Sequence, residues 1–267
     1  MTFARRTVPV VLLVLPILLL AACSAPGSAP TRAVQLQDAC GGSAPLPSGL
    51  HLDPFYEKYC MAGPLPIVAS GVVPDAALQR AKTIVTKMLT KVPPAAIQAI
   101  AAHQVRIGAI GVHQVTTDMP EYADLYTAFP GTDWDKRTRG VAATVQRPLT
   151  SSAEENLLCY PTDVYTGESI LVHEFAHTID EMGLEAIDPT FANRLQATYD
   201  SAMNAGLWQG SYSATNKKEY WAEGVQSYFG VSNNARDSVS ALEAYDKGLY
   251  DLIDAVFAGS PGIGLCP

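Results

Sequence analysis

Basic residues are scarce in this chain of 267 residues. It has 18 Lys and Arg against 26 Asp and Glu, a formal net charge of −8. An acidic chain without a basic stripe is a poor partner for nucleic acid. The sequence also lacks internal repeats at solenoid periods, which excludes a repeat architecture. Both absences favour a globular domain that does not bind nucleic acid.

A typical transmembrane helix needs about 20 consecutive apolar residues, and the sequence has no apolar run of that length. Residues 8–20 form a shorter apolar run, and Arg5 and Arg6 precede it. This order is typical of a secretory signal. The run ends in Leu20-Ala21-Ala22-Cys23, which resembles the signal of bacterial lipoproteins. That resemblance implies a lipid anchor on Cys23 at the extracytoplasmic face of a bacterial cell membrane. The alternative is an ordinary signal peptide cleaved after Ala22.

The chain divides into three parts on this interpretation. Residues 1–22 are the signal peptide, and their removal takes away Arg5 and Arg6 and no acidic residue. Lys and Arg then number 16 against 26 acids, so the net charge moves from −8 to −10. Residues 23–48 are rich in Ala, Pro, Gly and Ser and are predicted to form a flexible tether. Residues 49–267 are long enough for one compact domain.

Cysteine is scarce as well, with five in the chain. Apart from Cys23, an even number remains in a protein predicted to be exported: Cys40, Cys60, Cys159 and Cys266. Two disulfides are therefore expected, with three possible connectivities. We favour Cys40–Cys60 and Cys159–Cys266, because the first pair is local in the sequence.

Two of the five histidines belong to the motif His173-Glu174-Phe175-Ala176-His177, which has the pattern H-E-x-x-H. Residues 168–182 have the apolar pattern of a helix, in which residues four apart lie on one face. Both imidazoles can then bind one Zn²⁺, with Glu174 placed to polarise a water without ligating the metal. The motif predicts a zinc hydrolase, usually a peptidase.

A third metal ligand must come from another residue type, because no histidine follows His177. Asp180 and Gly183 stand where the metzincin motif requires glycine and histidine, so that class is excluded. A His₂Glu ligand set is a known alternative. Glu219 and Glu223 lie four residues apart in a predicted helix over residues 217–229. One of them can ligate the metal, and the other can accept the second ring N–H of a ligand histidine.

Two other interpretations of these glutamates stay open. Asn216 can cap the helix, with Glu219 completing a capping box at the third helical position. That role competes with metal ligation for the Glu219 carboxylate. Alternatively, both glutamates lie on a solvated helix face.

The segment of residues 212–223, together with H-E-x-x-H, resembles the gluzincins. Tyr212 stands seven residues before Glu219, as in the group that contains anthrax lethal factor and Pro-Pro endopeptidase. The resemblance covers residues 167–230 and implies a zincin-like fold, but it transfers no substrate preference. It implies metal ligation by His173, His177 and Glu219, a general base at Glu174, an oxyanion donor at Tyr212, and a hydrogen-bond acceptor for a ligand histidine at Glu223.

The periodicity of apolar residues predicts an α+β domain, with a small sheet, an active-site helix and a helical C-terminal half. Strands are expected at residues 105–112, 141–145 and 156–159. Helices are expected at residues 75–91, 93–102, 168–182, 189–205, 217–229 and 239–257. In zincin-type folds an edge strand pairs with extended substrate, and residues 147–160 are the expected place for it.

The resulting hypothesis is a membrane-anchored zinc endopeptidase that hydrolyses a peptide or protein substrate. The first alternative is a zinc-binding surface lipoprotein without turnover that acts as an adhesin or scaffold. The second is a ligand-binding lipoprotein with an accidental motif.

Overall fold

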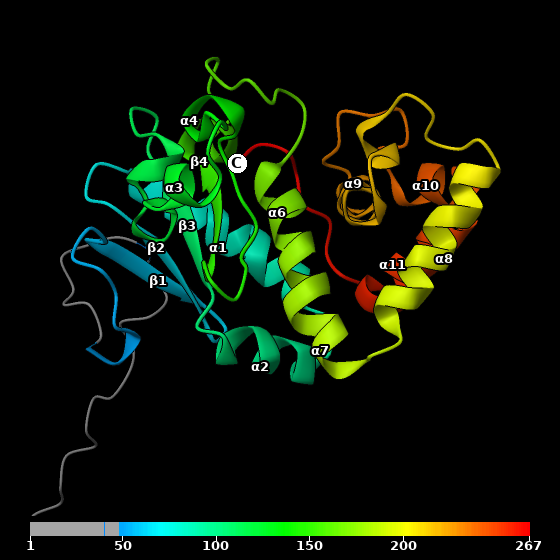
Figure 1. The fold of residues 1–267 in the computed structure, drawn as a ribbon, viewed down its shortest axis with the longest axis horizontal. Helices are drawn as coiled ribbons and strands as arrows, with labels where there is room; N and C mark the ends of the chain where they lie inside the picture. The colour runs from blue at the N-terminus through cyan, green and yellow to red at the C-terminus, as the bar shows by residue number, and fades with distance from the viewer. Residues whose placement is uncertain (1–39, 41–47) are drawn as a thin grey trace, which may run out of the picture. The chain divides into compact units, whose positions relative to one another are not determined.

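The structure, a computed structural model, describes residue 40 and residues 48–267 (Figure 1). The predicted signal peptide, Cys23 and nearly all of the predicted tether lie outside the described residues. No helix in the described part of the chain combines the length and the apolar character needed to span a bilayer.

Four short strands form one mixed sheet in the order β1-β2-β3-β4. They are β1 (Lys58–Ala62), β2 (Leu65–Ala69), β3 (Arg106–Ile110) and β4 (Leu149–Ala153). β1 and β2 form an antiparallel hairpin, whereas β2, β3 and β4 run parallel to one another. Every residue of β2 and β4 is buried, as expected for strands with both faces covered.

Helices cover one face of the sheet. α1 (Asp75–Leu89) and α2 (Pro94–Ala102) connect β2 to β3, close to their predicted bounds. α1 packs on β1, β2 and β3, while α6 (Ile170–Ile179) packs on β4 and against α1. The opposite face is covered by residues 111–139, where Met119, Tyr122 and Leu125 pack on Val68 and Leu149. The sheet therefore lies between a helical layer and a layer of short turns.

The C-terminal half is helical, as predicted. α8 (Phe191–Asn204), α9 (Lys217–Phe229), α10 (Val239–Tyr245) and α11 (Lys247–Phe257) pack together, and α9 also packs against α6. In Figure 1 the metal-motif helix α6 lies between the sheet and these helices. The shorter elements are η1 (Ser48–Leu50), η2 (Thr116–Asp118), η3 (Pro120–Tyr122), α3 (Leu125–Ala128), α4 (Trp134–Arg137), α5 (Glu154–Leu157), the π-helical turn η4 (Asp180–Leu184), α7 (Glu185–Ile187) and η5 (Tyr212–Ala214).

Three secondary-structure predictions were wrong. Residues 141–145 form no strand, although Val141 O accepts from Ser151 N at 2.8 Å along the outer edge of β4. Residues 156–159 contain the end of helix α5 instead of a strand. The predicted helix 239–257 is two helices, because the backbone of Asp246 is not helical (φ −138°, ψ 84°) and its carboxylate accepts from Leu249 N to begin α11.

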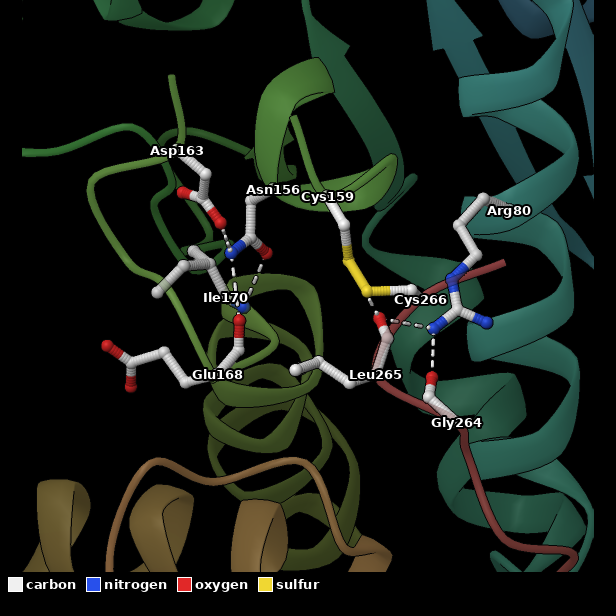
Figure 2. The surroundings of a disulfide bond; sticks show 9 residues. All are labelled: Arg80, Asn156, Cys159, Asp163, Glu168, Ile170, Gly264, Leu265 and Cys266. Carbon is white, nitrogen blue, oxygen red and sulfur yellow. Dashed lines mark hydrogen bonds between the residues drawn. A yellow bond between two sulfur atoms is a disulfide. The ribbon is translucent and has the colours of Figure 1, made fainter. Parts of the chain in front are cut away.

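Both favoured disulfides are present, so the predicted connectivity is confirmed. Cys40 joins Cys60, and Cys159 joins Cys266 across 107 residues. Figure 2 shows the second bond beside Arg80 of α1, which donates to the carbonyls of Gly264 and Leu265. The C-terminal tail is thereby fastened to the helical face of the domain.

Candidate metal centre

The two motif histidines lie one turn apart on α6. Their Nε2 atoms are 3.2 Å apart, and both side chains are largely buried. The helix begins where the Asn156 side chain accepts from Ile170 N at 2.9 Å and donates to Glu168 O at 2.8 Å. Asn156 thus satisfies backbone groups at the start of α6, a role that Ser169 at the N-cap does not fill with its own side chain.

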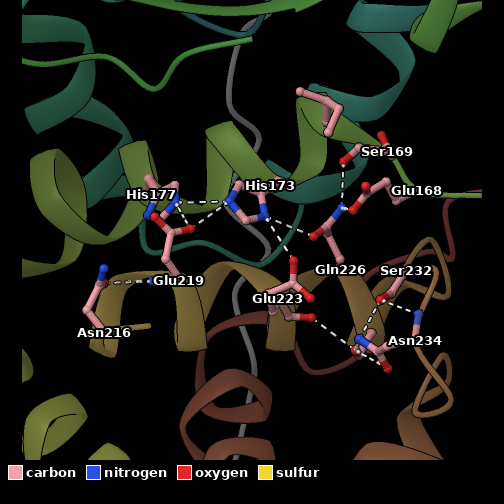
Figure 3. Close-up of polar contacts among 12 residues, drawn as sticks. Glu168, Ser169, His173, His177, Asn216, Glu219, Glu223, Gln226, Ser232 and Asn234 are labelled. Carbon is pink, nitrogen blue, oxygen red and sulfur yellow. Dashed lines mark hydrogen bonds and ion pairs between the residues drawn. The ribbon is translucent and has the colours of Figure 1, made fainter. Parts of the chain in front are cut away.

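Glu219 brings a carboxylate to the same point from α9. Its Oε2 lies 3.0 Å from His173 Nε2 and 3.3 Å from His177 Nε2 (Figure 3). Asn216 caps α9 by accepting from the backbone N–H groups of Lys218 and Glu219. The cap uses only the backbone N–H of Glu219. The Glu219 carboxylate therefore remains available to contact the histidines.

The three donor atoms fit a metal ion in chemistry and spacing. Two imidazole nitrogens and one carboxylate oxygen are a ligand set typical of zinc enzymes. Ligands about 2.0 Å from one ion at tetrahedral angles lie about 3.3 Å from each other. The observed separations are 3.2, 3.0 and 3.3 Å. His173, His177 and Glu219 could therefore hold one metal ion.

The opposite nitrogen of His173 contacts a residue that the sequence analysis missed. Nδ1 lies 2.9 Å from Gln226 Oε1 but 3.7 Å from Glu223 Oε1. The Gln226 amide donates to Ser169 O at 3.1 Å, so its orientation is set. Gln226, not Glu223, is within hydrogen-bonding distance of the ring. The sequence feature that could have identified Gln226 is its position seven residues after Glu219, which places both on the same helix face.

Burial and neighbouring groups shift the pKa values at this centre. Burial disfavours protonation of His173, but the Glu219 carboxylate, Glu174 and Gln226 outweigh it and raise the histidine pKa to about 9. Burial also opposes ionisation of Glu219, yet hydrogen bonds from His173 and His177 hold its pKa well below the usual range. His173 and Glu219 thus form an ion pair, and a metal cation can take the place of the histidine proton between them.

Glu174 lies on α6 between the two histidines in sequence and lines the cleft. Burial raises the pKa of its carboxyl, while the histidines and the backbone N–H of Ala142 lower it. The segment bearing Ala142 approaches α6 closely at Gly140. A Cβ there would lie 2.5 Å from Ile170 Cγ2 and 2.8 Å from Ser151 O.

Tyr212 stands at the mouth of the cleft on η5, just before α9. Its side chain is 56% exposed, and its ring centroid is 6.2 Å from that of His173. Partial burial, with the charges of Glu219 and Glu174, raises the pKa of the phenol to about 12. The hydroxyl is therefore protonated at neutral pH.

These groups share one open cleft of about 680 Å³. Its lining includes residues from the segment 134–141, Ser211 and Tyr212, and Glu219 and Glu223 of α9. A volume of this size is within the range of ligand-binding clefts. Within residues 147–160, where substrate pairing was expected, Glu155 and Asn156 are buried, and Glu155 pairs with Arg139 at 2.7 Å.

No protein-family model matches this chain, and no curated protein matches it.

Proposed function

We propose that this chain is a zinc-dependent endopeptidase with a zincin-like catalytic domain. The observation that carries the proposal is the meeting of His173, His177 and Glu219 around one point, with Glu174 beside them in an open cleft. A metal held only for structure would be expected in a closed four-ligand site. Three protein donors facing a cleft favour catalysis.

The zinc ion would supply Lewis acidity, lowering the pKa of water toward about 7 and polarising the scissile carbonyl. Glu174 accepts the proton of the attacking water and then passes it to the leaving amine nitrogen. Burial suits this exchange, because it raises the pKa of the carboxyl above its usual value.

The phenol of Tyr212 donates a hydrogen bond to the oxygen on which negative charge develops. Such a donor contributes because it is stronger in the transition state than in the ground state. Its raised pKa keeps the hydrogen available at neutral pH.

An extended substrate would lie along residues 140–142 rather than along β4. The sequence placed the substrate-binding edge within residues 147–160, but β4 is buried and Val141 bonds to its outer edge. Gly140 and Val141 line the cleft directly above the motif helix. The expected peptide contact therefore moves to this outer segment.

Glu174→Gln tests the proposal directly. This variant should bind one zinc ion per chain and lose about 10²–10⁴-fold in cleavage rate, because only the proton acceptor is removed. Zinc content is measured by elemental analysis, and cleavage with a mixed peptide library. Glu243→Gln, exposed on α10, is the matched control. Full activity in Glu174→Gln would contradict the mechanism. Zinc binding without any cleavage by the wild type would favour the adhesin or scaffold alternative.

We also propose that the domain is exported and anchored by lipid at Cys23. Two disulfides support an oxidising compartment. Cys23→Ser should move the protein from the membrane fraction to the soluble fraction of the cells, with no change in zinc content. An unchanged distribution would rule the anchor out.

A further inference from the structure

The loop before Tyr212 is fastened by a buried aromatic and acidic cluster that the proposed mechanism does not use. Its centre is Trp208, which is 1% exposed and has a left-handed backbone with φ of +61°. A bulky residue rarely adopts this conformation unless its surroundings enforce it.

Two hydrogen bonds hold Trp208 in that conformation. Its backbone N–H donates to the Tyr245 hydroxyl at 2.8 Å, and its indole N–H donates to Asp246 Oδ2 at 2.8 Å. The guanidinium of Arg236 lies 5.3 Å from the Trp208 ring centroid and 3.9 Å from that of Tyr245. We call Trp208, Tyr220, Arg236, Tyr245 and Asp246 the Trp208 latch.

The latch connects the two elements that complete the metal centre. Asp246 is 4% exposed, and the same Oδ2 accepts from the Tyr220 hydroxyl at 2.6 Å. Tyr220 follows Glu219 on α9. On the other side, Trp208 O accepts from Ser211 N at 3.0 Å and from Ser211 Oγ at 2.6 Å, directly before Tyr212.

Tyr212 itself is 56% exposed, so packing around its own ring does little to fix its position. The backbone that carries it must be held from elsewhere. The latch holds it on the N-terminal side, and on the C-terminal side the Tyr199 hydroxyl donates to Ala214 O at 2.7 Å. We infer that Trp208 and Asp246 are positioning residues that hold the Tyr212 phenol over the metal centre, an inference that rests on the proposed function.

Trp208→Phe tests this inference, because it keeps an aromatic ring and removes the indole donor to Asp246, together with part of the buried ring. We expect kcat to fall about 10–100-fold, with KM and zinc content unchanged, because a small misplacement of a catalytic group has effects of this size. In a Tyr212→Phe background the same substitution should cause no further loss, since both act through one phenol.

Tyr228→Phe is the matched control. Tyr228 also lies on α9 and donates to a carboxylate, Asp254, at 2.7 Å, but that bond leads away from Tyr212. It removes one hydrogen bond to a carboxylate, lowers stability less than Trp208→Phe because no ring atoms are lost, and should leave kcat unchanged. An equal loss of kcat in both variants, or additive losses in the double variant with Tyr212→Phe, would overturn the inference.

Hydrogen exchange separates failure of the inference from failure of the proposed function. Backbone amides of residues 211–215 should exchange faster in Trp208→Phe than in the wild type, whereas those of α6 should not. Unchanged exchange at residues 211–215 would overturn the inference even if no peptide were cleaved. If Trp208→Phe does not fold, Tyr245→Phe, which removes the acceptor of the Trp208 backbone N–H, is used with the same expectations.

Discussion

At the residue scale, the environment of His173 defines the candidate site. Its Nε2 faces His177 and Glu219, and its Nδ1 faces the amide oxygen of Gln226. An acceptor at Nδ1 keeps the proton on that nitrogen and leaves Nε2 free for a metal. A neutral amide fills this place here, although a carboxylate was expected.

Gln226→Ala should weaken zinc binding about 10–100-fold, because the ring loses the acceptor that sets its tautomer and orientation. Competition with a chelator of known affinity measures the effect. Glu223→Gln is the comparison, since Glu223 lies 3.7 Å from the same nitrogen. A larger loss in Glu223→Gln than in Gln226→Ala would show that the carboxylate is the true partner.

Asp180 should make stability depend on pH. Both of its carboxylate oxygens are buried without a hydrogen-bond partner among the described residues. Burial, with the charges of Glu185 and Glu181, raises its pKa from 3.8 to about 7. Between these values the unfolded chain has released the proton and the folded chain keeps it. The free energy of unfolding therefore falls as pH rises from about 4 to about 7.

Asp180→Asn removes this titration and should stabilise the protein above pH 7 by up to about 4 kcal/mol. Urea unfolding at pH 4.5 and pH 8 measures the difference between variant and wild type. Asp251→Asn, at an exposed position, is the control and should change stability by less than about 1 kcal/mol at both pH values. An equal effect at both pH values would contradict the assignment.

At the element scale, the candidate site depends on contacts that helix α6 makes on both sides. α9 supplies Glu219 and Gln226, and residues 140–142 cover the opposite side at Glu174. β4, which supports that segment, is buried although three of its residues are Thr150, Ser151 and Ser152. Their hydroxyls are polar, so the apolar pattern did not mark the strand. Thr150 Oγ1 instead bonds to Thr178 Oγ1 of α6 at 2.6 Å.

Gly140→Ala should separate the outer segment from α6, because neither Ile170 nor the backbone of Ser151 can make room for a methyl group. We expect a loss of about 1–3 kcal/mol in stability, typical of overpacking, together with reduced peptide cleavage. Chemical unfolding and the library assay measure the two effects. Gly262→Ala is the control, since a Cβ there would meet no atom within 4 Å. Equal stability of both variants would contradict the close approach.

At the scale of the whole molecule, covalent links tie distant parts of the chain to the core. The bond from Cys159 to Cys266 joins residues 107 apart in the sequence, and the loop that it closes includes α6, α9 and the three candidate metal ligands. The bond from Cys40 to Cys60 spans only 20 residues. Chain-entropy reasoning assigns the larger stabilisation to the longer loop.

Replacing Cys159 and Cys266 by Ser should lower the free energy of unfolding by about 4–5 kcal/mol, against about 3 kcal/mol for Cys40 and Cys60. Urea unfolding of the two double variants, without reducing agent, gives the comparison. A larger loss from the shorter loop would mean that native-state contacts near Cys40 outweigh chain entropy.

Local sequence patterns were sufficient to predict many features of this protein. The spacing of His173 and His177, the cap at Asn216 and most helices follow from interactions within a few residues, so the sequence alone predicted them. The parity of the cysteines likewise indicated two disulfides.

Tertiary structure decided the contacts between distant segments. In the folded chain, Glu219 lies beside histidines that are more than forty residues earlier in the sequence. Gln226 rather than Glu223 contacts His173 Nδ1, and the polar strand β4 is buried beside α6. The tertiary structure also broke the predicted last helix at Asp246, which bonds to Trp208 and Tyr220. These outcomes depend on which surfaces meet in space, and such meetings leave no periodic signal along the chain.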